Sequence, residues 1–237
     1  MKILALALVV LAAACGGAGD EEALTVFAAA SLTDVFEQVD PSARFNFAGS
    51  DELATQLREG ADADVYAAAS PRYPEELFDE GIIERPETFA TNRLVLIVPR
   101  DNPREIERLR DVAAPGVELV IGAEGVPVGD YTRDVLERAG RNDVLRRVVS
   151  EEEDVRGVLG KVALGEADAG FVYATDVAAA ADDVRAIELP RAAQAKVEYQ
   201  VAIVRGSGSR SAALRFVGTL LGAKGRASLE AAGFGLP

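Results

Sequence analysis

Two serines stand at matching places in this sequence, where an apolar run gives way to a helical pattern. Ser31 follows the apolar residues 24–30, and Ser50 follows a second short run at 44–47. The first N–H groups of a helix lack intrahelical partners and carry the positive end of its dipole, so they bind oxyanions. A serine hydroxyl beside them adds another donor. Each serine also has an ordinary interpretation as a helix N-cap, with Asp34 completing a capping box for Ser31.

Three features in the middle of the chain could supply the other half of an anion site. The turn at 125–130 contains proline and glycine and leaves backbone N–H groups free before a helix predicted over 130–139. Residues 152–155 open another helix, where acidic side chains stabilise the dipole with or without a ligand. Tyr173 ends an apolar strand. Its ring is typical of a partly buried aromatic anchor, and its hydroxyl needs a hydrogen-bond partner.

The elements that position these residues alternate between strand and helix, which predicts parallel sheets covered on both faces. Strands are predicted at 24–30, 44–47, 61–69, 92–99, 118–122, 144–149, 169–173 and 196–204, and helices at 31–39, 53–59, 70–80, 103–111, 130–139, 153–164, from 175, at 209–222 and at 224–232. The two long strands near 93–98 and 197–204 bracket a self-contained α/β unit.

This pattern predicts an α/β protein of two lobes whose chain crosses twice between them. We expect residues 24–91 and 203–237 to form the first lobe and residues 92–202 the second. Ligands of such sheets bind at the carboxyl ends of the strands, where Ser31 and Ser50 are predicted to lie.

The N-terminus has the features of an export signal. Residues 1–14 combine Lys2 with an apolar run that is too short to span a bilayer, and small residues follow. The sequence around Cys15 resembles a bacterial lipobox, which predicts lipidation of Cys15, and residues 15–23 would then form a tether. Cys15 is the only cysteine, so the exported fold can contain no internal disulfide.

Composition excludes several classes of function. The chain has 237 residues, a formal net charge of −14 and no histidine. The acidic balance argues against nucleic acid or anionic lipid as a partner. A histidine-ligated metal site and a Ser-His-Asp triad are both excluded. A few helix N-termini can still create a local positive field for a small anion.

Six segments of this sequence, in their order and spacing, resemble the periplasmic molybdate-binding proteins of bacterial ABC importers. They are VFAAASLTDVF, FAGSDEL, GADADVYAAAS, EGVPVGDYTRDVL, EEDVRGVLGKVALGEADAGFVYATD and KVEYQVAIV. The resemblance runs from Leu24 to the C-terminus. It implies a type II periplasmic-binding fold that closes like a hinge around molybdate or tungstate, acts as a monomer without a cofactor or enzymatic activity, and delivers the anion to a membrane permease.

The resemblance also assigns the ligands of the anion. It implies hydroxyl donors at Ser31, Ser50 and Tyr173 and main-chain N–H donors at Val128 and Val155. This chain departs from the family pattern beside Ser50, where Gly49 and Asp51 replace hydroxyl residues, and at Val128, where alanine is common.

A site made of hydroxyls and amides suits an oxyanion that is fully deprotonated at neutral pH. Monohydrogen phosphate would leave its own proton without an acceptor, which costs about 1–3 kcal/mol when buried. Two alternatives stay open. A receptor for sulfate or another tetrahedral oxyanion would use the same fold, and a secreted hydrolase would use Ser31 as a nucleophile.

Overall fold

The computed structural model describes residues 23–237. The predicted export signal, Cys15 and nearly all of the predicted tether lie outside the described residues. Within the described part, no helix has both the length and the apolar character that a membrane crossing requires.

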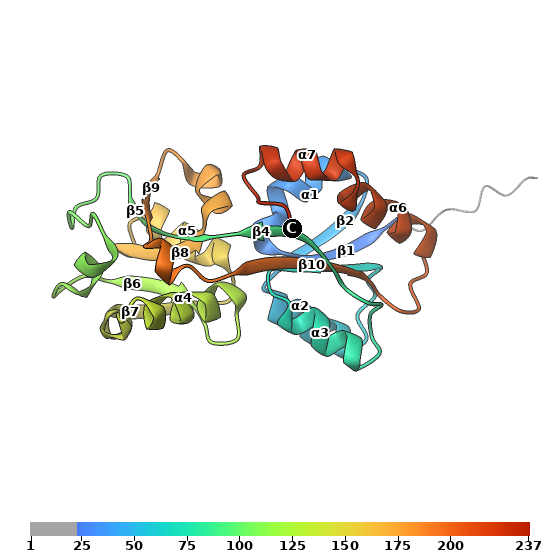
Figure 1. Ribbon diagram of the computed structural model, residues 1–237, viewed down its shortest axis with the longest axis horizontal. Helices are drawn as coiled ribbons and strands as arrows, with labels where there is room; N and C mark the ends of the chain where they lie inside the picture. The colour runs from blue at the N-terminus through green and yellow to red at the C-terminus, as the bar shows by residue number, and fades with distance from the viewer. Residues whose placement is uncertain (1–22) are drawn as a thin grey trace, which may run out of the picture.

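Two five-stranded sheets form the frame of the molecule, one in each lobe (Figure 1). The first has the order β2-β1-β3-β10-β4 and the second the order β7-β6-β8-β5-β9. The strands of the first sheet are β1 (Thr25–Ala29), β2 (Arg44–Ala48), β3 (Val65–Ala68), β4 (Glu87–Asn92) and β10 (Val197–Ile203). Those of the second are β5 (Leu94–Pro99), β6 (Leu119–Gly122), β7 (Val148–Glu152), β8 (Ala169–Tyr173) and β9 (Val184–Glu188).

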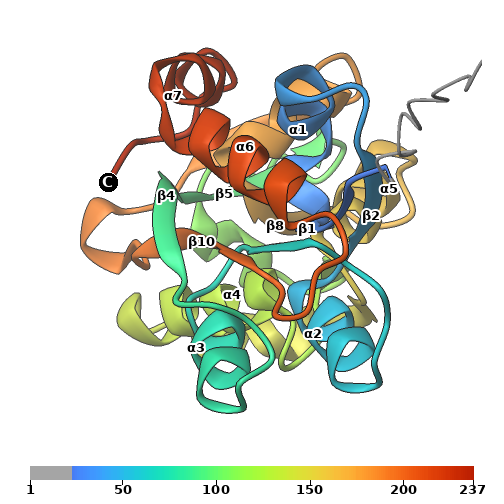
Figure 2. The ribbon, with the colours of Figure 1, turned by 90° about the vertical axis from the view of Figure 1, so that its right-hand side faces the viewer.

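Helices cover both faces of each sheet. The α-helices are α1 (Thr33–Val39), α2 (Ser50–Arg58), α3 (Arg72–Asp79), α4 (Pro127–Arg138), α5 (Val155–Ala163), α6 (Arg210–Leu221) and α7 (Ala223–Ala231). Short 3-10 helices are η1 (Ala30–Leu32), η2 (Leu109–Ala113), η3 (Asn142–Arg147), η4 (Ala174–Ala180) and η5 (Arg191–Ala193). On the first sheet, α1, α6 and α7 lie on one face and α2 and α3 on the other (Figure 2).

Both sheets are mixed, which corrects the prediction of parallel sheets. The neighbours of β1 and of β6 are parallel, but β10 runs antiparallel to β3 and β4, and β5 runs antiparallel to β8 and β9. The antiparallel strands are those that carry the chain between lobes. β5 is buried along its whole length, as the unbroken apolar run predicted.

The chain crosses between lobes at Arg93, between β4 and β5, and again between β9 and β10. β10 pairs with β3 and β4, so residues 197–203 lie in the first sheet, although the sequence placed residues up to 202 in the second lobe. The apolar pattern of a long strand does not show which lobe contains it. Only the pairing of the strand within a sheet decides this. One buried apolar cluster runs through both lobes, and a smaller one lies under α2 and α3.

Local predictions were wrong where short polar turns replace regular elements. Residues 103–108 form turns rather than the helix predicted at 103–111, and only η2 follows. The strand predicted at 144–149 is largely η3, and β7 begins at Val148. Neither β4 nor β9 was predicted as a separate strand.

Candidate oxyanion site

A small cavity lies between the lobes, where the starts of four helical segments meet. Its space measures about 220 Å³, open mouth included. The first lobe contributes Ala29, Ala30, Ser31, Ala48, Gly49, Ser50 and Ala69, and the second contributes Val126, Pro127, Val128, Asp154, Val155 and Tyr173. All five predicted ligand residues therefore border one cavity. The alanines keep the surrounding side chains short, so a ligand can approach the main chain.

Ser31 does not cap a helix, contrary to its ordinary interpretation. It lies inside η1, whose N-cap is Ala29, and α1 begins after Leu32 without a side-chain cap. The capping box with Asp34 is therefore absent. The Ser31 side chain is buried, and its Oγ lies 3.0 Å from the Tyr199 hydroxyl oxygen.

Ser50 is the first residue of α2 rather than its N-cap, which is Gly49. Its Oγ accepts a hydrogen bond from the Ala69 N–H at 3.1 Å. The Ser50 hydroxyl proton finds no protein acceptor among residues 23–237, so it can be donated to a ligand in the cavity.

Val128 and Val155 each lie in the first turn of a helix. Pro127 begins α4, three residues earlier than predicted, and a proline at this position costs no hydrogen bond. The N–H groups of Val128 and Val155 therefore belong to the set without intrahelical partners. Asp154 caps α5 by accepting the Gly157 N–H at 2.9 Å. This hydrogen bond directs the Asp154 Oδ1 toward the start of the helix.

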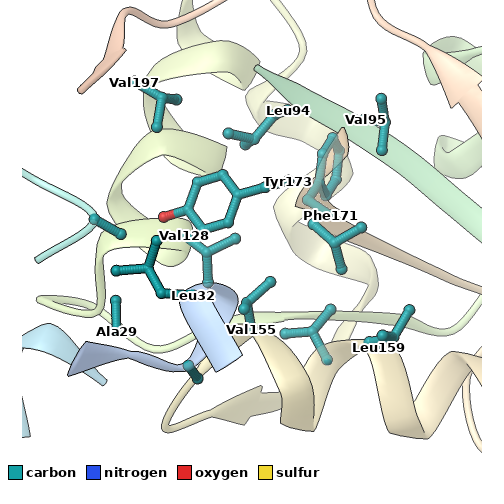
Figure 3. Close-up of a cluster of buried hydrophobic side chains, with 14 of the residues drawn as sticks. Ala29, Leu32, Leu94, Val95, Val128, Val155, Leu159, Phe171, Tyr173 and Val197 are labelled. Carbon is teal, nitrogen blue, oxygen red and sulfur yellow. The ribbon is translucent and has the colours of Figure 1, made fainter. Parts of the chain in front are cut away.

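Tyr173 is almost wholly buried, with 1% of its surface exposed, so its burial exceeds that of the partly buried anchor that the sequence predicted. Burial raises the pKa of Tyr173 well above its ordinary value, so the hydroxyl stays protonated. Its oxygen has no hydrogen-bond partner within the described chain. Figure 3 shows this hydroxyl on the side of the ring that faces Val128. A buried donor without a partner indicates a place for a ligand oxygen.

Neutral groups, rather than cationic side chains, supply the hydrogen-bond donors along the described lining of this cavity. No lysine or arginine is among the described residues that line it. Within residues 23–237 there is also no cluster of acidic, cysteine or histidine side chains that could hold a metal ion. The donors are hydroxyls and helix N-termini, and these groups bind anions.

The lobes touch on two sides of the cavity, so the structure has a closed cleft. The Arg156 Nη2 of α5 lies 2.7 Å from the Asp34 Oδ2 of α1. The Tyr73 hydroxyl of α3 donates to the carbonyl oxygen of Gly125 in the second lobe. These contacts can form only when the lobes approach each other.

Asp176 is a buried acid next to this cleft. Its Oδ2 accepts the Tyr173 N–H at 3.1 Å, and its Oδ1 lies 3.8 Å from the Arg156 Nε. Burial raises the pKa of Asp176 to about 7, although Arg156 and the Tyr173 N–H oppose the rise.

The buried Asp176 should make stability depend on pH. Below its raised pKa the folded protein keeps a proton that the unfolded chain releases, so the free energy of unfolding falls as pH rises through this range. Asp176→Asn retains an acceptor for Tyr173 but cannot ionise. We expect its melting temperature to fall less than that of the wild type between about pH 5 and about pH 8. Parallel pH profiles in thermal denaturation would contradict this assignment.

The sequence profile described as bacterial extracellular solute-binding protein matches residues 24–235. The chain belongs to this family of bacterial extracellular solute-binding proteins. The molybdate-binding protein ModA of Mycobacterium tuberculosis is 36% identical over 224 residues, which cover 90% of this chain and 85% of the relative. ModA of Escherichia coli is 32% identical over 203 residues, which cover 79% of each chain.

Solved structures confirm the predicted two-lobed fold of this solute-binding protein. The periplasmic molybdate-binding protein of Azotobacter vinelandii superposes with a TM-score of 0.79 at 24% identity, covering 90% of this chain and 99% of that one. The sulfate-binding protein SubI of Mycobacterium tuberculosis gives 0.76 at 17% identity, covering 90% and 86%. At these identities the likeness concerns the fold.

Sequence reasoning missed two residues that the structure places behind the solute site. Tyr199 was read only as part of a long strand, yet its hydroxyl contacts Ser31. Asn92 was read only as the start of an apolar run, yet it contacts Tyr199 and Thr175. The available signal for Asn92 was its position as a polar residue at the end of an otherwise apolar strand.

Proposed function

We propose that this solute-binding protein captures molybdate, and tungstate with it, by closing its lobes around the anion and delivers it to an ABC importer. One observation supports this most strongly. Hydroxyls of Ser31, Ser50 and Tyr173 and helix starts at Val128 and Val155 border one small cavity, and its lining within residues 23–237 includes no cationic side chain. The relatives named molybdate-binding proteins support the same ligand.

The chemistry of the donors favours a fully deprotonated tetrahedral dianion. Hydroxyls and amides can each donate to an oxyanion, whereas a protonated anion needs an acceptor in return. The Oδ1 of Asp154 accepts the Gly157 N–H and therefore faces the start of α5. Sulfate has the same charge and is smaller, so molybdate must be preferred through the size of the closed cavity.

Calorimetric titration with sodium molybdate, sodium tungstate and sodium sulfate tests this proposal. We expect molybdate and tungstate to bind much more tightly than sulfate. A preference for sulfate would replace the proposal with a sulfate receptor, and no binding of any of the three would refute it. Ester hydrolysis that depends on Ser31 would instead support the hydrolase alternative.

The hydroxyl donors should contribute unequally to molybdate affinity. Ser31→Ala and Ser50→Ala should each weaken binding by about 1–3 kcal/mol, the range for a hydrogen bond to an ion. Tyr173→Phe should cost less if water replaces the hydroxyl, and it should not lower ligand-free stability because the hydroxyl has no hydrogen-bond partner among the residues that the structure describes. The exposed Ser211→Ala is the matched control. Unchanged affinity in all three site variants would contradict this site.

We further propose that the protein acts outside the cytoplasm as a monomer, held to the membrane by a lipid on Cys15, and that it is not an enzyme. The lipobox resemblance and the family support the location. Cys15→Ser should release the protein from the membrane fraction of cells. If the variant stays in that fraction, the anchor lies elsewhere.

A further inference from the structure

The Ser31 hydroxyl can serve the ligand only if its proton points into the cavity. Ser31 Oγ and the Tyr199 hydroxyl oxygen are 3.0 Å apart, and either could donate to the other. If Ser31 donates to Tyr199, it presents lone pairs to the anion. If Tyr199 donates to Ser31, the serine proton is free for the anion. The direction of this one bond therefore decides whether Ser31 attracts or repels an oxyanion.

Asn92 favours one direction of this bond. Its Oδ1 accepts the backbone N–H of Arg93 at 2.9 Å, and a backbone N–H can only donate, so the amide has one possible orientation. Its Nδ2 therefore faces the Thr175 Oγ1 at 3.0 Å and the Tyr199 hydroxyl oxygen at 3.5 Å. Because Nδ2 only donates, the Tyr199 oxygen is the acceptor there.

The Tyr199 proton then has Ser31 as its acceptor. Tyr199 is fully buried, and burial raises the pKa of its hydroxyl well above the ordinary value, so the proton is retained at neutral pH. Ser50 shows the same arrangement with a simpler donor, since its Oγ accepts the Ala69 N–H. In this arrangement the Oγ of each serine accepts a hydrogen bond from a protein donor, and its proton is left for the ligand.

We propose that Asn92 and Tyr199 form a hydrogen-bond relay that fixes the Ser31 hydroxyl as a donor to the bound oxyanion. Both are positioning residues, because they act through Ser31. The inference rests on the proposed oxyanion site and deepens it. Asn92 ends β4 beside the first crossing, and its partner Thr175 belongs to the second lobe. The relay therefore has its full set of partners in the closed arrangement.

A double-mutant cycle with molybdate tests the relay. Tyr199→Phe removes the proton given to Ser31 and keeps the ring, so we expect about tenfold weaker binding by calorimetry. In the Ser31→Ala background the same change should alter affinity by less than about twofold, since the two residues act as one unit. An equal loss in both backgrounds would mean that Tyr199 acts only by packing, and the relay would be wrong.

Asn92→Asp gives a second, independent test. It replaces the donor facing Tyr199 with an acceptor, so Tyr199 would donate to the carboxylate and Ser31 would turn its proton away from the cavity. We expect a larger loss than for Tyr199→Phe, and most of it should vanish in the Ser31→Ala background. A loss that persists there would reflect the added charge and would overturn the relay.

The outcomes separate the relay from the proposed function. Wild-type protein that binds none of the oxyanions defeats the function itself. Wild-type protein that binds molybdate while Tyr199→Phe binds it equally well defeats only the relay. Melting curves of each ligand-free variant establish that it is folded before affinities are compared.

Discussion

Replacing Gly129 with alanine is expected to destabilise the protein and to weaken molybdate binding together. Gly129 is in the first turn of α4, next to Val128. An added Cβ would lie well inside contact distance of the carbonyl oxygens of Gly122 and Ala123, at the end of β6. These are backbone atoms and cannot rotate away. The start of α4 must therefore move off the sheet and carry the Val128 N–H with it.

We expect Gly129→Ala to lower the free energy of unfolding by about 1–3 kcal/mol or more, the cost of overpacking. The affinity for molybdate should fall at least about tenfold. Urea denaturation and calorimetry measure the two effects. Gly160→Ala is the matched control, because a Cβ at this position of α5 meets no atom within 4 Å. That change should be neutral or stabilising by about 0.5–1 kcal/mol and leave binding unchanged.

Gly49→Ala should produce the second large effect, but without loss of stability. Gly49 belongs to the first lobe, and an added Cβ would lie 2.5 Å from the carbonyl oxygen of Glu153 in the second lobe and 2.7 Å from the Asp51 Oδ1 of its own lobe. The backbone of Gly49 has φ −59° and ψ 140°, which alanine adopts freely. The added methyl therefore obstructs closure against a fixed backbone oxygen, whereas within its own lobe it displaces only the Asp51 side chain, which can rotate.

Affinity for molybdate should fall about 5- to 150-fold in Gly49→Ala, the equivalent of about 1–3 kcal/mol of steric cost. The melting temperature without ligand should stay the same or rise slightly, since alanine restricts the unfolded chain. Small-angle scattering should also show less contraction on adding molybdate. Gly218→Ala, in α6 of the same lobe with open space around it, serves as control. Wild-type affinity in Gly49→Ala would show that the lobes need not approach this closely.

The sequence predicted the arrangement of elements better than their local detail. Ser31 and Ser50 were placed correctly at strand-to-helix junctions, because a change from a continuous apolar run to helical spacing is a strong signal. Their roles as helix caps were wrong, since η1 begins two residues earlier than a Ser31 cap required and α2 one residue earlier than a Ser50 cap required. Helix boundaries depend on hydrogen bonds that a single sequence does not display.

Contacts between distant segments were the part that sequence reasoning could not reach. Tyr199 and Ser31 are 168 positions apart, and nothing in either neighbourhood indicates the other. Gly49 has an ordinary backbone conformation, so the sequence gives no reason for a glycine there. The reason is the Glu153 carbonyl oxygen of the other lobe, which leaves no room for a side chain. Similarly, the lobe to which β10 belongs depended on its pairing with β3 and β4.

The two crossings leave the first lobe from neighbouring strands, with Asn92 of β4 paired to Val197 of β10. Two adjacent connections define a single axis, and a swing of the lobes about it leaves this pairing within the first sheet intact. Such a swing works as a lever, because points far from the axis travel further than the donors beside it. Under the proposed function, binding of one small anion beside the axis would change the outline at the outer ends of the lobes, and a membrane partner would distinguish loaded from empty protein by that shape.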